Sequence, residues 1–201
     1  ADLTEIEDVL QGVRDIIAEE ITDQQESRQL ARQITFEQGQ LQVEPKVEEV
    51  TEYEEYYDFQ ADISEISPHQ TLAINRGEEE EVLKVKVTAD DEQILAKLKD
   101  KFITGASIFK EEIAAAIEDG YQRLLAPAIA REVRSHLTEE AADHAINIFA
   151  RNLRNLLLQP PVSEKRVLAI DPGFKAGCKV AAVNELGDLL ATEAVYPPPP
   201  Q

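Results

Sequence analysis

Apolar residues near the start of the chain recur with a helical period. Within residues 4–22 they fall three and four positions apart, which places one stripe of them on an amphipathic helix: Ile6, Val9, Leu10, Val13, Ile16, Ile17 and Ile21. Thr22 and Gln25 have the spacing of a capping box, which predicts a second helix over residues 23–38. Gly39 is expected to end that helix. The pattern predicts a helical hairpin.

Residues 40–66 have a less regular pattern, which Pro45 interrupts. Four aromatic residues stand close together among carboxylates in this stretch: Tyr53, Tyr56, Tyr57 and Phe59. Aromatic side chains can stack on nucleic-acid bases, but such sites combine them with basic residues. The surrounding charge here is negative, so we expect these aromatics to pack onto neighbouring helices.

A short helix and a strand are expected next. Ser67, Pro68 and Gln70 form a capping box with proline in the first turn, and Gly77 is expected to end the helix. Residues 81–88 alternate between apolar and polar side chains, which predicts a strand with one solvated face. This is the one β segment predicted before residue 160.

The chain then returns to the helical period. One stripe follows Asp90, comprising Ile94, Leu95, Leu98 and Phe102. A long helical region continues with Ile113, Ile117, Tyr121, Leu124, Leu125, Ile129 and Val133. We expect a kink at Pro127, because proline lacks the helical N–H. A new helix is predicted from Thr138, with these residues facing inward: Ala141, Ala145, Ile148, Phe149, Leu153, Leu156 and Leu157.

Pro160 and Pro161 are expected to end the helical part, giving a helical domain over residues 1–160 and a second domain over 161–201. In the second domain the spacing of apolar residues changes from the helical period to a period of two. This predicts three short strands: RVLAID, CKVAAVN and LLATEAVY. Turn-rich connections make them an antiparallel meander. The predicted fold is mainly α, with a multi-helical scaffold followed by this meander. Its apolar face lacks a cover of its own, which predicts packing on the helical domain or self-association through the sheet.

Charge is distributed unevenly along the chain. The net charge is −20, with 30 acidic and 11 basic residues in 1–118 but 10 and 9 in 119–201. An acidic surface repels phosphates, so any nucleic-acid contact is expected in the second half. The candidates are Arg123, Arg131, Arg134, Arg151, Arg154, Lys165 and Arg166. No apolar run is long enough to span a membrane and no signal peptide is visible, so a cytoplasmic protein is expected.

Asp171 is the only candidate catalytic residue. A carboxylate at the end of a strand can hold Mg²⁺, but two-metal catalysis requires several converging carboxylates, and the alternative is that Asp171-Pro172-Gly173 is simply a favourable turn. Asp188 stands in a later turn and need not approach it. The three histidines lack metal-ligand spacing, and no phosphate-binding loop is present. We therefore predict no metal, no cofactor and no enzyme activity for this chain alone.

Three segments resemble the bacterial Tex family of transcription accessory proteins: EYEEYYDFQADISEISPHQTLAINRGEEEEVLKVKV, YQRLLAPAIAREVRSHLTEEAADHAINIFARNLRNLLL and VLAIDPGFKAGCKVAAVNELGDLLATEAVYP. The last is similar to the start of that family's YqgF, or ribonuclease-H-like, α/β domain. The resemblance covers about residues 16–197. It implies a helical region with helix-turn-helix character, and it places Asp171 at the position of the first metal-binding aspartate of ribonuclease-H-like nucleases.

The resemblance also implies a role. Family members bind nucleic acid mainly through a C-terminal module that has no counterpart in this chain, and they resemble a eukaryotic elongation factor that works with RNA polymerase. We therefore expect a fragment of a nucleic-acid-binding transcription accessory protein that acts as a positioning scaffold. Two alternatives stay open: a metal-dependent nuclease that uses Asp171, and an acidic module that binds basic partners.

Overall fold

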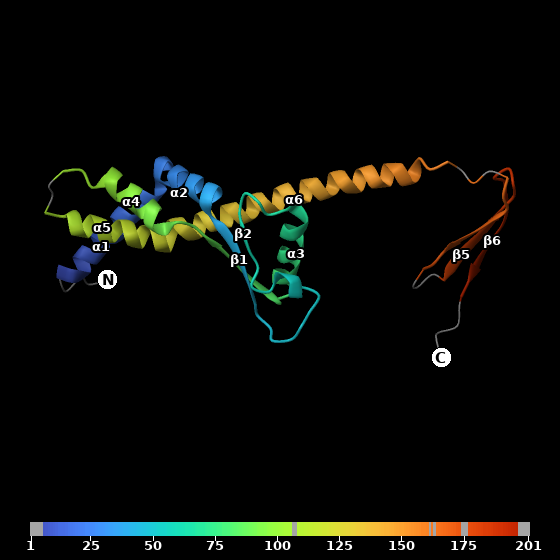
Figure 1. The fold of residues 1–201 in the computed structure, drawn as a ribbon, viewed down its shortest axis with the longest axis horizontal. Coiled ribbons are helices and arrows are strands. Elements are labelled where there is room, and N and C mark those ends of the chain that lie inside the picture. The colour runs from blue at the N-terminus through green and yellow to red at the C-terminus, as the bar shows by residue number, and fades with distance from the viewer. Residues whose placement is uncertain (1–5, 106–107, 161, 163, 174–176, 197–201) are drawn as a thin grey trace. The chain divides into compact units, whose positions relative to one another are not determined.

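The computed structural model describes residues 6–105, 108–160, 162, 164–173 and 177–196, which form two compact units (Figure 1). The first unit ends at Phe149 and the second begins at Ala150. Helices dominate the first unit, and the second contains a three-stranded antiparallel sheet. The structure thus confirms the mainly α fold class and the meander that follows it.

The first two helices are α1 (Ile6–Asp23) and α2 (Gln25–Gln38), as the apolar period predicted. The predicted capping box between them is wrong. The residue that precedes α2 is Gln24, which makes no side-chain cap, and the Thr22 hydroxyl donates to the carbonyl of Glu19 within α1. The turn between the helices is therefore too short to leave Thr22 at a helix start.

A three-stranded sheet that the sequence only partly predicted follows α2. Its strands are β1 (Gln40–Pro45), β2 (Gln60–Asp62) and β3 (Leu83–Thr88), in the order β2-β1-β3. Both neighbours run antiparallel to β1. The predicted strand over 81–88 is confirmed as β3, whereas β1 and β2 were not predicted.

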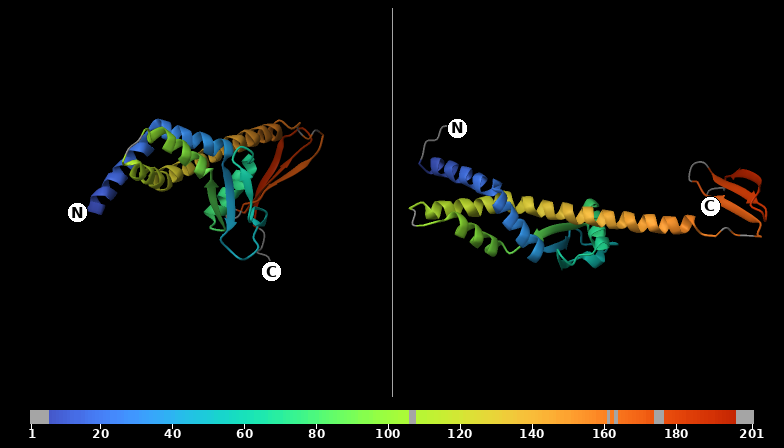
Figure 2. Two further views of the ribbon diagram at one scale, coloured as in Figure 1. Left: turned by 60° about the vertical axis from the view of Figure 1, so that its left-hand side comes forward. Right: turned by 90° about the horizontal axis from the view of Figure 1, so that it is seen from above.

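The tyrosine-rich connection packs on this sheet. Tyr53 precedes the 3-10 turn η1 (Glu54–Tyr56), Tyr56 is its last residue, and both are buried. They join a cluster with sheet residues and one residue of α3 (Pro68–Glu79): Leu41, Val43, Ile74 and Leu83. These aromatics are packed, as expected, but the prediction that they pack onto helices is met only through α3, because the sheet supplies most of the partners. Figure 2 shows α3 and this sheet beside the long helix α6 (Ala126–Leu157).

The capping box that starts α3 is confirmed, with Gln70 accepting from the backbone N–H of Ser67 at 3.0 Å. Gly77 does not end the helix, which continues to Glu79. Gly77 is buried because Leu83 packs directly against it, and a Cβ built there would lie 2.6 Å from a Leu83 methyl. The glycine therefore serves a close helix–strand contact rather than a helix stop.

The remaining helices are α4 (Asp91–Phe102), α5 (Lys110–Gly120) and α6 (Ala126–Leu157). A π-helical turn, η2 (Tyr121–Leu125), joins α5 to α6 directly before Pro127. The interruption expected at the proline thus takes the form of a widened turn, which relieves the ring's crowding of the preceding carbonyl. The predicted new start at Thr138 is wrong, because α6 is continuous there and the Thr138 hydroxyl donates to the carbonyl of Arg134.

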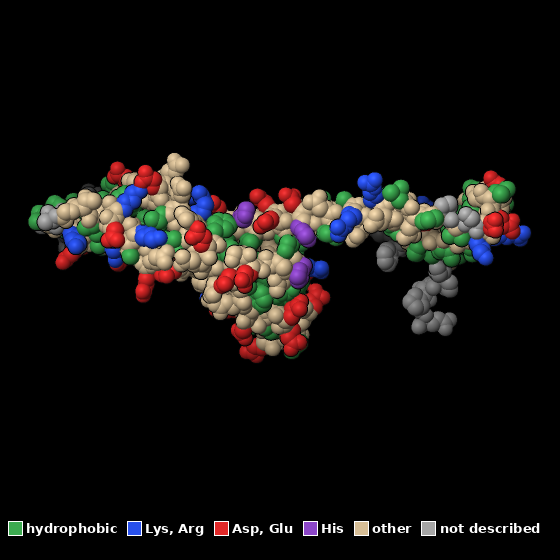
Figure 3. All heavy atoms as spheres, turned by 45° about the horizontal axis from the view of Figure 1, so that its top comes forward, with side chains coloured by type: hydrophobic (Ala, Val, Ile, Leu, Met, Phe, Trp, Pro, Cys, Tyr) green, Lys and Arg blue, Asp and Glu red, His purple; other side chains and the backbone are tan. Residues whose placement is uncertain are grey.

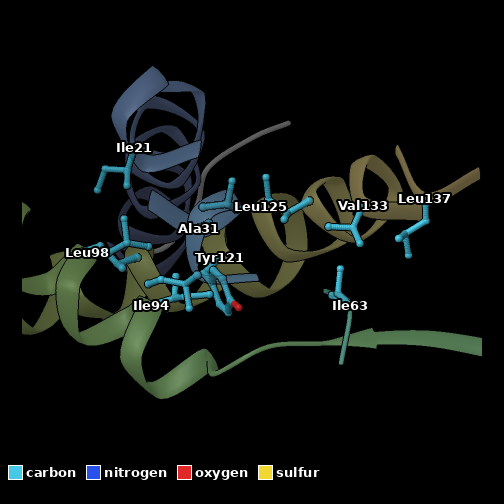
Figure 4. Packing of buried hydrophobic residues seen from close by; sticks show 12 residues of the cluster. Ile21, Ala31, Ile63, Ile94, Leu98, Tyr121, Leu125, Val133 and Leu137 are labelled. Atoms are coloured by element: carbon cyan, nitrogen blue, oxygen red, sulfur yellow. The ribbon is translucent and has the colours of Figure 1, made fainter. Parts of the chain in front are cut away.

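The main core of the first unit lies along α5, η2 and α6. Every fourth residue of this stretch is buried: Ile117, Tyr121, Leu125, Ile129, Val133, Leu137 and Ala141. Residues of α1, α2 and α4 close over them, including Ile21, Ala31, Ile94 and Leu98 (Figure 4). This core holds the helical unit together, because burial of so many aliphatic side chains is the main favourable term in folding.

The end of α6 is not covered as predicted. Ala141 is buried, but most of the later residues expected to face inward are exposed, including Phe149, Leu153, Leu156 and Leu157. The helical period correctly identified an apolar stripe. It could not show whether another element of the chain packs against it.

The second unit contains β4 (Val167–Asp171), β5 (Cys178–Val183) and β6 (Leu189–Val195). They form an antiparallel meander in the order β4-β5-β6, with a bulge near Val183. Leu168, Ile170 and Leu189 are exposed, so the expectation of an apolar face without a cover holds for the described residues.

Candidate nucleic-acid interface and the Asp171 strand

Asp171 is the last residue of β4, and the register places it beside Lys179 of β5. Directly paired residues of antiparallel strands project from the same face, with Cβ atoms about 5 Å apart. A shallow hollow of about 560 Å³ includes both residues and is also lined by Ile170, Val180 and Glu193, with alanines and Thr192 between them. The nearest neighbour across the strand from the candidate carboxylate is therefore a cation.

Two other carboxylates of the second unit lie near β4 or its neighbours, Glu193 and Asp188. Glu193 borders the same hollow, but the register pairs it with Val180, the neighbour of Ile170, so it projects from the opposite face of the sheet. Asp188 lies in the β5–β6 turn, where Asn184 donates to its carboxylate at 3.0 Å. That turn follows Val183, which pairs with Val167 at the opposite end of β4 from Asp171. Among the described residues, no group of three or more His, Cys, Asp and Glu side chains could hold a metal ion. The residues described around Asp171 do not fit a two-metal centre.

The basic residues predicted near the start of α6 differ in how they are engaged. Arg123 donates to Asp119 at 2.9 Å, and this hydrogen bond raises the pKa of its guanidinium. Arg134 donates to Asn75 at 2.8 Å and to Glu78, so it joins α6 to α3. Burial lowers the pKa of the Arg134 guanidinium, and the charge of Glu78 opposes that shift. Both side chains hold structural contacts, whereas Arg131 is exposed without an ion pair to any described residue.

The other four candidates belong to the second unit. Arg151 and Arg154 stand three positions apart on α6, which places them on neighbouring positions of its surface, and both are exposed. Lys165 is exposed in the connection before β4, and Arg166 donates to Glu185 at 3.1 Å. Figure 3 shows basic side chains on the later part of α6, while acidic side chains gather over the lobe that holds α3. Within the described part of the chain, Arg151, Arg154 and Lys165 have no acidic partner.

One candidate site was missed by reasoning from the sequence. A groove of about 450 Å³ runs between β3 and α6, and it brings Arg131 and Arg134 together with Lys86 of β3. The alternation of Lys84 and Lys86 in the predicted strand was the available signal. It identified a solvated face but not the helix that lies beside it.

No helix in the described part of the chain combines the length and the apolar composition needed to cross a membrane.

Comparison with family models gives two adjacent matches. Residues 1–149 match the model described as Tex central region-like, and residues 165–201 match the Tex protein YqgF-like domain.

Comparison with curated proteins gives relatives that are longer than this chain. An uncharacterized protein, YdcI, of Bacillus subtilis is 42% identical over 199 residues, covering 96% of this chain and 28% of the relative. The S1 RNA-binding domain-containing protein 1 of Homo sapiens is 32% identical, covering 96% of this chain and 21% of the relative. The transcriptional accessory protein Tex of Neisseria gonorrhoeae is 29% identical, covering 93% and 26%. The chain thus spans between about a fifth and three tenths of the length of these relatives.

Proposed function

Since the chain belongs to the Tex family, we propose that it is a positioning scaffold within a nucleic-acid-binding transcription accessory protein. The names of the human and Neisseria relatives support a role connected with RNA and transcription. Such a role is carried out in the cytoplasm of bacteria, and RNA polymerase is the partner that we propose for the whole protein.

The observation that carries this proposal is the continuity of α6. The helix runs for 32 residues, or about 48 Å at 1.5 Å per residue, and its first half is buried in the core of the first unit. We propose that the buried first half anchors the helix and leaves its exposed second half available to other modules of the whole protein. Its later apolar residues, including Phe149 and Leu156, are exposed and offer a surface for a further module of the same protein.

The scaffold proposal predicts weak binding of nucleic acid by these 201 residues. We expect a dissociation constant weaker than about 10 μM for labelled single-stranded RNA at 0.15 M salt, in the range of non-specific contacts. Residual binding should fall with salt and should drop further in the triple variant of Arg151, Arg154 and Lys165 to Ala. A matched triple variant of the ion-paired Arg123, Arg134 and Arg166 should bind RNA like the parent if it stays folded. Tight binding that resists salt would contradict the proposal.

We propose that Asp171 is not a catalytic residue, because its register neighbour is Lys179 and the described residues around it contain no group of three metal-ligating side chains. The intact protein, incubated with Mg²⁺ and RNA or DNA, is expected to leave the substrate uncut. Cleavage that requires Mg²⁺ and disappears in Asp171→Asn would establish the nuclease instead.

The alternative function, an acidic module that binds basic partners, is less favoured because carboxylates of this module already form ion pairs within the chain. Arg134 binds Glu78, and Arg76 binds Glu80. Retention of a basic protein that is lost when the run Glu78–Glu81 is neutralised would restore it. The exposed faces of the second sheet support self-association, which light scattering would detect as a mass that rises with concentration.

A further inference from the structure

β3 is an edge strand of the first sheet, and the register shows which of its backbone groups are unpaired. The N–H of Val43 on β1 donates to the carbonyl of Phe59 beside β2, so odd-numbered residues of β1 direct their backbone groups toward β2. Even-numbered residues of β1 therefore face β3, where they pair with even-numbered residues. The N–H and C=O groups of Val85 and Val87 consequently point away from the sheet.

These outward groups have no partner among the described residues, because no hydrogen bond outside the β1–β3 ladder reaches Val85 or Val87. They border the groove between β3 and α6, which has a volume of about 450 Å³. The side chains of Val85 and Val87 and the methyl of Ala130 give it an apolar lining. A cavity around Ala126 and Pro127 shares Val87 and Ala130 with it, so the hollow continues along the strand.

The rim of this groove is positive, although the chain as a whole carries a net charge of −20. Arg131 is exposed on α6 without an acidic partner, and Lys86 lies on β3 with Glu44 at 3.2 Å. Arg134 and Glu78 balance one another at the same rim. Lys86 and Arg134 each pair with a carboxylate, so Arg131 supplies the unpaired positive charge of the groove.

We propose that this groove binds an extended acidic peptide segment, which adds to the open edge of β3 as a fourth strand. Strand addition supplies donors and acceptors for the outward groups of Val85 and Val87. Alternate side chains of the added strand would lie against the apolar lining, and Asp or Glu residues would meet Arg131 and Lys86. The net negative charge of the chain repels an acidic peptide elsewhere on its surface, so we expect such a peptide to bind only where it contacts the cations of the rim.

The lining of the groove favours a peptide over RNA. Nucleic-acid grooves that bind single strands combine basic residues with aromatic side chains on which bases stack. Among the described residues, no aromatic side chain lines the groove itself, and Tyr121 of the adjoining cavity donates its hydroxyl to Asp91. The groove has instead a row of backbone groups at the spacing of a strand. Those groups match the repeat of another peptide backbone and do not match the repeat of phosphates.

The 201-residue chain and a fluorescein-labelled seven-residue peptide of alternating Glu and Val provide the test. We expect saturable binding by fluorescence anisotropy, with affinity that falls as salt rises. A peptide in which Lys replaces Glu should bind at least about tenfold more weakly, because its charges oppose the rim. Equal binding of the two peptides would overturn the proposal.

Variants locate the site. Arg131→Glu should weaken binding at least about tenfold, whereas Arg151→Glu, a matched reversal on the same helix outside the groove, should leave it unchanged. Val85→Pro removes an outward N–H without touching the ladder and should also weaken binding. Unchanged binding in both Arg131→Glu and Val85→Pro would contradict strand addition at this edge.

Amide hydrogen exchange tests the same register in the parent chain. On adding the Glu–Val peptide, the amides of Val85 and Val87 should exchange more slowly, while that of Lys86, already in the ladder, should not change. Slowing at residues of another strand, with none at Val85, would place the peptide elsewhere. Displacement of the bound peptide by single-stranded RNA, with the same dependence on Arg131, would assign the groove to nucleic acid and refute the peptide proposal.

Discussion

The two sheets of this protein have the same number of strands and opposite surroundings. In the sheet β2-β1-β3, Leu41, Val43 and Leu83 are almost completely buried. In the sheet β4-β5-β6, Leu168 and Ile170 are more than half exposed. Both sheets are antiparallel and three-stranded, so strand pairing alone does not explain the difference.

The difference in exposure depends on whether other segments pack against the face of each sheet. The loop with Tyr53 and Tyr56 and the helix α3 both lie between the strands of the first sheet in sequence, and they fold back onto its face. The connections of the second sheet, residues 172–177 and 184–188, contain too few residues to reach across a face. A three-stranded meander therefore depends on what its connections carry, because a bare one buries too little apolar area for independent stability.

The largest expected effect comes from removing a side chain at the covered face. Leu83→Ala should lower the free energy of unfolding of the first unit by about 2–5 kcal/mol, because the site is fully buried. The matched change Leu168→Ala should alter the stability of the second unit by less than about 0.5 kcal/mol. Hydrogen exchange of β1 and of β5 at increasing urea measures the two effects separately. A cost for Leu168→Ala equal to that for Leu83→Ala would show that the second sheet is covered after all.

A smaller loss is expected where the first sheet meets α2. A Cβ added at Gly39 would lie 2.3 Å from the Thr35 carbonyl oxygen and 2.9 Å from that of Thr88, and both are backbone atoms. Gly39→Ala should therefore destabilise the first unit by about 1–3 kcal/mol. Gly12→Ala is the control, since Gly12 lies in α1 with open space around it, and should stabilise the helix by about 0.5–1 kcal/mol. Thermal unfolding followed by circular dichroism would compare them, and a neutral Gly39→Ala would contradict the packing of α2 on β3.

The smallest effect concerns pH. The Arg14 guanidinium of α1 donates to Glu112 of α5, and this hydrogen bond lowers the pKa of the Glu112 carboxyl below its ordinary value of 4.5. The contribution is present above that value and is lost as pH falls through the lowered pKa. Glu112→Gln should therefore flatten slightly the acid side of the stability–pH curve, whereas Glu111→Gln, at an exposed neighbour, should not. Urea midpoints between pH 3 and 7 would show whether the two variants differ.

Much of the fold could be predicted from period and capping, and the failures have identifiable causes. The helices α1, α2 and α4 and the strand β3 follow directly from apolar spacing. β1 was missed although Leu41 and Val43 alternate with polar residues, because the run is short and Pro45 ends it. The exposed residues at the end of α6 were predicted to face inward, because helical spacing shows that apolar residues share one face of a helix but not whether another element packs against that face.

The candidate site was less predictable, since it depends on contacts between distant segments. Arg134 was chosen for its charge, but Glu78 and Asn75, more than fifty positions earlier, engage it. The groove between β3 and α6 depends on which edge of the sheet is open, and this required the strand order β2-β1-β3. That order could not be predicted once β1 and β2 had been missed.

The buried positions of α5, η2 and α6 form a spiral rather than a straight line. Each four-residue step on an α-helix overshoots one full revolution by about 40°, so successive core residues from Leu125 to Ala141 migrate around the cylinder. Tyr121 thereby reaches Asp91 of α4, while Leu137 borders the hollow beside Phe36 and Ile63. The continuous helix thus packs against different elements on different sides. Deleting a single residue between Leu125 and Leu137 would rotate the later helical residues by about 100° relative to the earlier ones, so the two halves of the core would no longer align.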